Sequence, residues 1–350
     1  MKEIDIDGWQ PCTGGKTLVV AEIGVNHDGE LGRALELVGI AADCGADAVK
    51  LQIFQAHKLI HSSGTFANYQ KAATVAVSPR AMLERYELGD DELREVVDEI
   101  KHRKMIPLAT PFSQDDVDQI EALQLPAIKI ASPDVVNWPL LRRCAQSRLP
   151  MLVSTGAANI NEISSSVAWL RGWDAAVALL HCVSSYPTPA TETNLSWIAE
   201  MHHRFELPVG YSDHTTEIIA GALAVSAGAC IVEKHITYDC TAKGPDHSAS
   251  ADPREFEQYV QLLRVAEQMQ GRGTRRVLDI ERDVRNVSRQ SLVAVRDLPK
   301  GHLLREEDLT VQRPGTGIPA AAFPSMVGLV MGQSIRKGQM LTWQIISDAA

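Results

Sequence analysis

From residue 17 onward, short apolar runs alternate with longer segments whose apolar residues recur every three or four positions. The first pattern is typical of buried strands and the second of amphipathic helices. Several helical segments begin at residues that commonly cap helices, such as Asp90, Ser113 and Asn159. The predicted strands cover residues 17–25, 47–54, 106–110, 127–132, 150–155, 176–182, 207–212 and 230–236.

Eight strand–helix units are the number that closes a parallel (β/α)8 TIM barrel, so we expect this α/β fold over residues 1–270. An open doubly wound sheet is the alternative. Such a sheet usually carries a Gly-rich dinucleotide motif after its first strand. Here that turn reads GVNHDGE, which lacks the motif. The barrel is therefore the preferred prediction.

The alternating pattern ends after Gly271. Residues 271–287 are charged and only weakly periodic, which predicts a linker. Residues 288–350 contain short β-like runs separated by turn residues, which predicts a small, mostly β domain.

The composition narrows the class of protein. Hydrophobic residues make up 45% of the 350 residues, which is enough for a large core. The net charge of −10 argues against nonspecific nucleic-acid binding, because a surface that follows phosphates is basic. The N-terminus lacks the apolar segment of a signal peptide, no run reaches the length of a membrane span, and the six cysteines form no CxxC pair. We expect a cytoplasmic protein that binds neither nucleic acid nor membrane.

The active site of a TIM barrel lies at the carboxyl ends of its strands, and each predicted strand carries polar residues there. Residues two apart on a strand point to the same face, so Lys50 shares a face with Gln52, and Glu233 with His235, while Lys234 faces the other way. The other polar residues near these ends are Glu22, Thr110, Lys129, Ser132, Ser154, Ser184, Ser212 and His214.

Two kinds of site are compatible with these residues. His214 ends the strand next to that of His235, so the two imidazoles could hold a divalent metal with open positions, or could be hydrogen-bonded histidines without metal. Lys50 and Lys129 could bind an anion together with serine hydroxyl groups, or could each pair with a barrel carboxylate. An imine-forming lysine remains an alternative, although the sixth predicted strand contains no lysine.

Nine collinear motifs resemble those of the sialic acid synthase family, the N-acetylneuraminate and related nonulosonate synthases. They are AEIGVNHDG, GADAVKLQ, ATPF, IKIAS, STG, HCVSSYPTP, GYSDHT, EKHIT and KGPDHSAS. The C-terminal segment around RPGTG is similar to the antifreeze-protein-like (SAF) domain of that family. The resemblance extends from about residue 17 to residue 350.

The resemblance implies an enzyme that condenses phosphoenolpyruvate with an N-acyl amino-hexose, typically N-acetylmannosamine, and water. The products would be a nine-carbon keto sugar acid and phosphate. It implies a divalent metal ion, Mn²⁺ or Mg²⁺, held by His214 and His235. Phosphoenolpyruvate would be bound by Lys50, Gln52, Thr110, Lys129, Ser132, Ser154, Ser184 and Ser212.

The same resemblance implies that the sugar is bound by Glu22, Tyr186, Asp246 and Arg313. Arg313 would come from the small domain of a neighbouring chain, which makes the active unit a domain-swapped homodimer. Lys129 and His235 would act in catalysis, and Glu233 is the carboxylate that we expect to move a proton.

Five positions depart from the pattern that the family leads us to expect: Ala109, Pro133, Ser184, Gln55 and His57. None of them removes a metal ligand or a cationic phosphate ligand, but some lie in loops that shape the sugar pocket. The identity of the sugar therefore stays open. A legionaminate- or pseudaminate-type synthase, a spore-coat polysaccharide synthase, a synthase acting on a sugar phosphate and a non-catalytic sugar-binding paralogue are the alternatives.

Overall fold

The computed structural model describes residues 3–11, 15–61, 64, 78–271 and 273–346. The chain divides into two units, Met1–Arg272 and Gly273–Ala350. Most of the segment predicted as a linker belongs to the second unit and contains a short helix, α12 (Arg282–Ser288).

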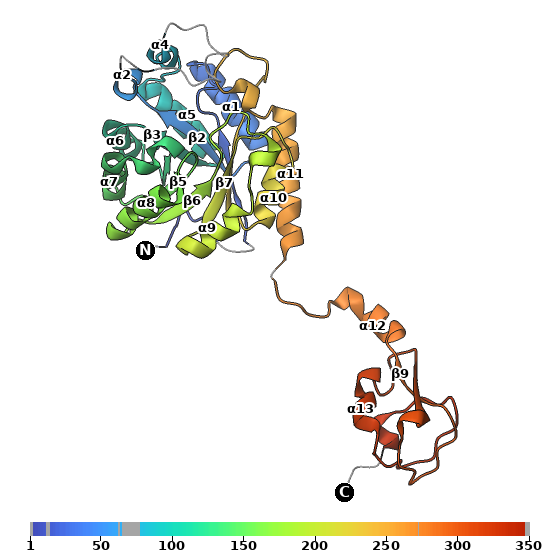
Figure 1. The fold of residues 1–350 in the computed structure, drawn as a ribbon. Helices are drawn as coiled ribbons and strands as arrows, with labels where there is room; N and C mark the ends of the chain where they lie inside the picture. The colour runs from blue at the N-terminus through green and yellow to red at the C-terminus, as the bar shows by residue number, and fades with distance from the viewer. Residues whose placement is uncertain (1–2, 12–14, 62–63, 65–77, 272, 347–350) are drawn as a thin grey trace. The chain divides into compact units, whose positions relative to one another are not determined.

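The first unit contains a closed barrel of eight parallel strands that follow one another in sequence order, as predicted (Figure 1). Pairing of β1 with β8 closes the barrel and sets Glu22 opposite His235. The strands are β1 (Leu18–Glu22), β2 (Ala48–Ile53), β3 (Ile106–Pro111), β4 (Ile128–Ile130), β5 (Met151–Ser154), β6 (Val177–His181), β7 (Val209–Asp213) and β8 (Ile231–His235).

Helices surround this barrel and connect its strands (Figure 1). Two of the predicted caps are present, since Ser113 Oγ accepts from the Asp116 N–H and Asn159 Oδ1 from the Glu162 N–H. Asp90 is instead the first residue of its helix, after Gly89. The described helices of the first unit are α1 (Leu31–Asp43), α2 (Ala56–Leu59), α4 (Pro79–Leu83), α5 (Asp90–His102), α6 (Gln114–Ala122), α7 (Trp138–Gln146), α8 (Ile160–Gly172), α9 (Trp197–Phe205), α10 (Ala220–Ser226) and α11 (Pro253–Gln270).

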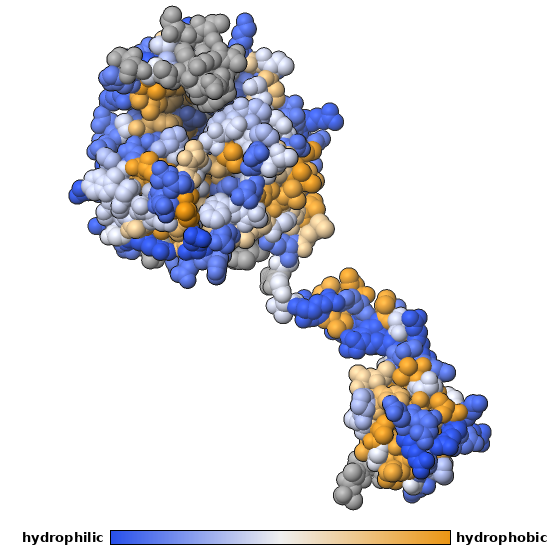
Figure 2. All heavy atoms as spheres, in the orientation of Figure 1, coloured by the Kyte–Doolittle hydropathy of each residue, from blue (hydrophilic) through white to orange (hydrophobic). Residues whose placement is uncertain are grey.

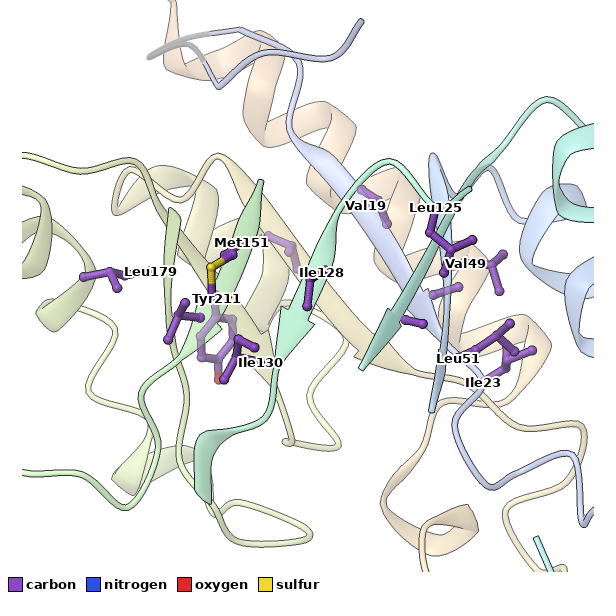
Figure 3. Packing of buried hydrophobic residues seen from close by; sticks show 14 of the residues in the cluster. Val19, Ile23, Val49, Leu51, Leu125, Ile128, Ile130, Met151, Leu179 and Tyr211 are labelled. Carbon is purple, nitrogen blue, oxygen red and sulfur yellow. The ribbon is translucent and has the colours of Figure 1, made fainter. Parts of the chain in front are cut away.

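The strands separate two apolar clusters by simple alternation. Outward residues such as Val19, Val49 and Met151 pack in the layer between the strands and the helices (Figure 3). The second cluster includes Leu18 and Val20 of β1, Leu108, Leu152, Leu180 and Ile231 from other strands, and Ile4 and Ile6 from the N-terminal segment. Toward the carboxyl end of β1 the same inward face continues to Glu22, so an apolar floor lies beneath a polar layer.

The second unit is small and has its own apolar core, which includes Leu292, Leu304 and Leu341. Its paired strands are antiparallel, β9 (Ser291–Ala294) and β10 (Leu309–Gln312), and it also contains α12 and α13 (Phe323–Met326). Several isolated bridges extend the β structure, so the expectation of a small, mostly β domain is confirmed.

The surface of the barrel unit is largely polar, with apolar side chains gathered over α10 and α11 (Figure 2). Leu223, Val265 and Met269 are exposed in this area. Across the part of the chain that the structure describes, every helix is too short or too polar to span a membrane.

Candidate active site

A layer of buried polar side chains lies at the carboxyl ends of the barrel strands. The strand register sets Glu22 beside Lys50, Gln52 beside Thr110 and Ser212 beside Glu233. Almost all of these side chains are buried, although such groups are normally found at the surface. The structure therefore brings together the residues that the strand pattern had predicted for this end: Glu22, Lys50, Gln52, Thr110, Lys129, Ser154, Ser212, His214, Glu233 and His235.

Two lysines and two glutamates form the centre of this layer. Lys50 Nζ is ion-paired with Glu22, lies 3.1 Å from Thr110 Oγ1 and is 3.7 Å from Glu233 Oε1. Lys129 Nζ lies 3.3 Å from the same Glu233 oxygen, which also accepts a hydrogen bond of 3.1 Å from Ser212 Oγ. Both lysines thus pair with barrel carboxylates, as one of the two sequence interpretations allowed.

The four side chains shift one another's pKa values. Burial disfavours the charged form of every member. For Glu233 the two lysines outweigh burial and lower its pKa to about 2, and for Lys50 the carboxylates raise its pKa. Burial dominates at Glu22, whose pKa is raised, and at Lys129, whose pKa is lowered.

Buried ion pairs seldom stabilise a fold. Removing one ion from water costs several kcal/mol, and a well-packed apolar replacement is often at least as stable. A barrel does not need two lysines and two glutamates in its interior in order to fold. The cluster is therefore best explained by a ligand that needs these charges.

A second group of polar atoms surrounds Gly156, and we call it the Gly156 cradle: Ser132, Cys182 and Ser184. Ser132 Oγ accepts a hydrogen bond of 3.1 Å from the Gly156 N–H and lies 2.9 Å from Cys182 Sγ. A Cβ atom at position 156 would lie 2.4 Å from Ser184 Oγ and 2.7 Å from Cys182 Sγ, so only glycine leaves these groups in place. Ser154 Oγ, two residues earlier, is buried and has no hydrogen-bond partner among the described residues. Such donors suit a phosphate or carboxylate group.

The two histidines lie near each other, with ring centroids 5.7 Å apart. Tyr186 packs against both rings, with centroid distances of 4.2 Å to His214 and 5.9 Å to His235. His214 Nδ1 donates to the Val183 carbonyl oxygen at 2.7 Å, so Nε2 carries the electron pair of the neutral ring, and Nε2 lies 3.4 Å from Ser212 Oγ. His235 Nδ1 is buried, has no hydrogen-bond partner among the described residues and lies 3.7 Å from Asp246 Oδ2.

These two imidazoles fit the requirements of a divalent metal ion. Burial lowers the pKa of His214 and of His235 to about 3, so both rings are neutral near pH 7 and offer electron pairs to a cation. Within the described residues, no cluster of three or more His, Cys, Asp and Glu side chains has the arrangement of a metal site. Two imidazoles alone would leave most coordination positions open, which is typical of a catalytic rather than a structural site.

Lys234 shows why a charged residue can occupy an otherwise apolar strand. Its side chain lies on the outer face of β8, as the alternation predicted, where Nζ pairs with Asp213 Oδ2 at 3.0 Å and donates to the Thr215 carbonyl oxygen. Asp213 in turn accepts from the Thr215 N–H at 2.8 Å. This pair therefore holds the backbone on both sides of His214.

Of the remaining predicted site residues, four lie at the carboxyl end of the barrel and Arg313 lies in the second unit. Tyr186 and Asp246 lie beside the histidines, and Ser132 and Ser184 lie in the Gly156 cradle. Arg313 belongs to the second unit, where it follows β10. Its predicted place near the sugar of a partner chain is not tested by the structure.

Sequence reasoning missed several residues that complete this end of the barrel. The sequence pattern assigned no role to Cys182, Asp28 or His247. Asn26, which follows the first predicted strand, was likewise given no role. The available signal was weak: all four lie within the family motifs, yet none carries an isolated charge on a predicted strand.

The comparisons with known proteins agree with this architecture. A model described as the NeuB family matches residues 37–275, and a SAF domain model matches residues 289–346. The chain belongs to the NeuB family. The resemblance drawn from the nine motifs and the C-terminal segment is therefore confirmed.

Two relatives of this NeuB-family chain that match most of its length are named as synthases. It is 37% identical over 349 residues to the N,N'-diacetyllegionaminic acid synthase of Legionella pneumophila, with 97% of this chain and 98% of that protein covered. It is 36% identical to the synthase of the same name from Campylobacter jejuni, with 93% and 99% covered.

A solved structure of a sugar-acid synthetase is also similar to this chain. The crystal structure of N-acetylneuraminic acid (sialic acid) synthetase from Leptospira borgpetersenii, in complex with citrate, matches at 31% identity and a TM-score of 0.73. The match covers 81% of this chain and 95% of that one. This NeuB-family chain is accordingly an enzyme of the sugar-acid synthase type.

Proposed function

We propose that the chain condenses phosphoenolpyruvate with an N-acyl amino-hexose and water, giving a nine-carbon keto sugar acid and phosphate. A carbon–carbon bond forms between the enol methylene carbon and the aldehyde carbon of the open-chain sugar. Water adds to the oxygen-bearing carbon of the former enol, and the resulting tetrahedral intermediate loses phosphate. One observation carries this proposal: two buried ammonium groups, the Gly156 cradle and two neutral imidazoles meet at one end of the barrel.

Phosphoenolpyruvate would bind as an anion against Lys50 and Lys129. These ammonium groups already contact Glu22 and Glu233, so the bound anion would share them with the carboxylates. Hydroxyl groups of Thr110, Ser154 and Ser212 would add neutral donors, which stabilise negative charge without a further buried cation. The remaining predicted contacts are Gln52, Ser132 and Ser184.

The role expected for Glu233 changes in this proposal. A carboxylate with a pKa of about 2 remains ionised at neutral pH and is a weak proton acceptor. Its contacts with Lys129 and Ser212 support a different task, which is to orient the ammonium and hydroxyl groups that face the anion.

His214 and His235 would hold the divalent ion, Mn²⁺ or Mg²⁺. When bound, such an ion supplies Lewis-acid polarisation of the sugar carbonyl and activation of water. The chain's own contribution is to present two neutral imidazoles, one of them fixed by the Val183 carbonyl oxygen.

The sugar would lie on the side of Glu22, Tyr186 and Asp246, with Arg313 of the partner subunit completing the pocket of a swapped homodimer in the cytoplasm. Two relatives that match nearly the full chain are named for N,N'-diacetyllegionaminic acid, whose name records two N-acetyl groups. We therefore favour a hexose with two N-acetyl groups over N-acetylmannosamine as the acceptor.

A panel of acceptors tests this proposal. Purified protein with phosphoenolpyruvate and Mn²⁺ is given N-acetylmannosamine, N-acetylmannosamine 6-phosphate or a 2,4-diacetamido-2,4,6-trideoxyhexose, and phosphate release is followed. We expect release that depends on the acceptor and is fastest with the diacetamido sugar. Preference for the phosphorylated sugar would contradict the acceptor assignment, and no release with any sugar would support the non-catalytic paralogue.

A further inference from the structure

Two loops at the carboxyl end of the barrel are joined by one carboxylate. Asp28 lies in the loop after β1, and its Oδ2 accepts a hydrogen bond of 2.7 Å from the Tyr238 hydroxyl group. Its Oδ1 lies 3.1 Å from His247 Nε2. Tyr238 and His247 both belong to the loop that follows β8, so Asp28 holds that loop at two places.

The partners of Asp28 are themselves fixed. His247 is fully buried, and its Nδ1 lies 2.7 Å from the Thr237 hydroxyl group. Its Nε2–H donates to Asp28, because an ionised carboxylate can only accept. The Arg33 guanidinium lies 3.7 Å from the centre of the Tyr238 ring. Hydrogen bonds to a charged acceptor are about twice as strong as neutral ones, so this contact is suited to anchoring a loop.

Asn26 joins the same two loops at a second point. Its Nδ2 donates to the Ile236 carbonyl oxygen and to Ser250 Oγ, both at 2.8 Å. Ser250 Oγ also lies 2.7 Å from the Asp246 carbonyl oxygen, which its hydroxyl group can reach as a donor. The first and last residues of the segment 236–250 are therefore attached to Asn26, and residues 238 and 247 within it to Asp28.

Asp246 lies within this segment and faces His235, with 3.7 Å between Asp246 Oδ2 and His235 Nδ1. In the described part of the chain, no hydrogen-bond donor contacts the Asp246 carboxylate. Its position is consequently set by the backbone of the segment and not by bonds of its own.

We propose that Asn26 and Asp28 are positioning residues that fix the acceptor-sugar side of the site by holding Asp246 in front of His235. Neither side chain needs to touch the sugar. The inference rests on the proposed function, in which Asp246 binds the acceptor. Phosphoenolpyruvate would bind at Lys50 and Lys129 instead. Loss of the contacts that Asp28 makes should therefore change the KM of the acceptor sugar and not that of phosphoenolpyruvate.

Asp28→Ala tests the inference in the full-length protein. Asp28→Asn keeps the size of the side chain and one acceptor oxygen, and carries the same test if the alanine variant does not fold. Asp239→Ala is the matched control, because Asp239 is a carboxylate of the same loop that only caps its own turn at Thr241. Hydrogen–deuterium exchange of residues 236–251 is measured without substrates, and KM is measured for each substrate.

For Asp28→Ala we expect exchange across 236–251 and the KM of the acceptor each to rise about tenfold, while the KM of phosphoenolpyruvate stays within about twofold. Asp28→Asn should give a smaller change in the same direction. Asp239→Ala should alter exchange only near its own turn. If the wild-type protein turns over no acceptor, the proposed function fails, while faster exchange in the variant would still establish the contact between the loops.

Three results would overturn the inference. Exchange equal to that of the wild-type protein would show that Asp28 does not hold the segment. Faster exchange with both KM values unchanged would show that the position of the segment does not affect acceptor binding. An equal rise of both KM values together with a lower melting temperature would indicate a general structural role.

Discussion

Replacing Gly156 by alanine should close the Gly156 cradle, which we propose as part of the phosphoenolpyruvate site. The new Cβ atom would lie 2.4 Å from Ser184 Oγ, 2.7 Å from Cys182 Sγ and 2.9 Å from Ser132 Oγ. All three distances are well inside van der Waals contact. Ser184 is exposed and can rotate away, whereas Cys182 and Ser132 are buried and have little room to move.

Because Cys182 and Ser132 can move little, the added methyl group should lower both stability and substrate affinity. Forcing one extra methyl group into a packed site costs about 1–3 kcal/mol, which corresponds to a fall of about 2–10 °C in the melting temperature of the barrel unit. The displaced Ser132 would also lose its bond from the Gly156 N–H. We therefore expect the KM of phosphoenolpyruvate to rise at least about tenfold, since one misplaced donor in a binding site has an effect of this size.

Calorimetric melting and steady-state phosphate release measure both effects. Gly172→Ala is the matched control, because position 172 ends α8 and has open space where the methyl group would go. That variant should be neutral or more stable by up to about 1 kcal/mol and should keep wild-type kinetics. A Gly156→Ala protein with the wild-type melting temperature and KM would refute the assignment of the cradle.

Three further predictions concern the titratable side chains of Lys129, His235 and Asp308. Lys129→Met leaves Glu233 with the Ser212 hydroxyl group and the more distant ammonium group of Lys50, so urea unfolding should show a loss of about 3 kcal/mol. A Lys129→Met/Glu233→Gln double variant should largely recover this stability without recovering phosphate release. His235→Ala should keep the native circular dichroism spectrum but bind Mn²⁺ at least about tenfold more weakly by electron paramagnetic resonance, and an unchanged affinity would contradict the metal assignment. The bonds that Asp308 accepts from His302, the Arg305 N–H and Arg296 outweigh its burial and lower its pKa from 3.8 to about 2, so its stabilisation is present above about pH 4 and is lost as the pH falls toward 2. Asp308→Asn should therefore destabilise the second unit by about 1–2 kcal/mol at pH 7 in calorimetric melts, with the difference vanishing near pH 2.

The amino-acid pattern predicted which strand residues share a face, but it could not predict which charged side chains pair. The period of two along a strand placed Glu233 and His235 on one face and Lys234 on the other, and the structure has this arrangement. The same pattern could not decide whether Lys50 and Lys129 would be free for a ligand or paired. Pairing depends on which strands become neighbours and at what height each residue lies, and both are decided by closure of the barrel.

Loops were the least predictable part of the site. The hydroxyl and thiol groups around Gly156 come from two separate segments, one after β4 and one after β6, and nothing local in their sequences aims them at one glycine. Asn26 and Asp28 meet the loop after β8 only because β1 and β8 close the barrel. Residues at loop positions lack a repeating backbone geometry, so their directions follow from long-range packing and not from spacing.

The sequence by itself determined the class of fold, the number of strand–helix units and the polar character of the strand ends, because backbone periodicity couples each residue to its near neighbours. The tertiary structure alone decided which lysine meets which glutamate, how the two histidines face each other and which loop holds Asp246. These contacts join residues that are far apart in the chain, and their geometry exists only once the barrel has closed.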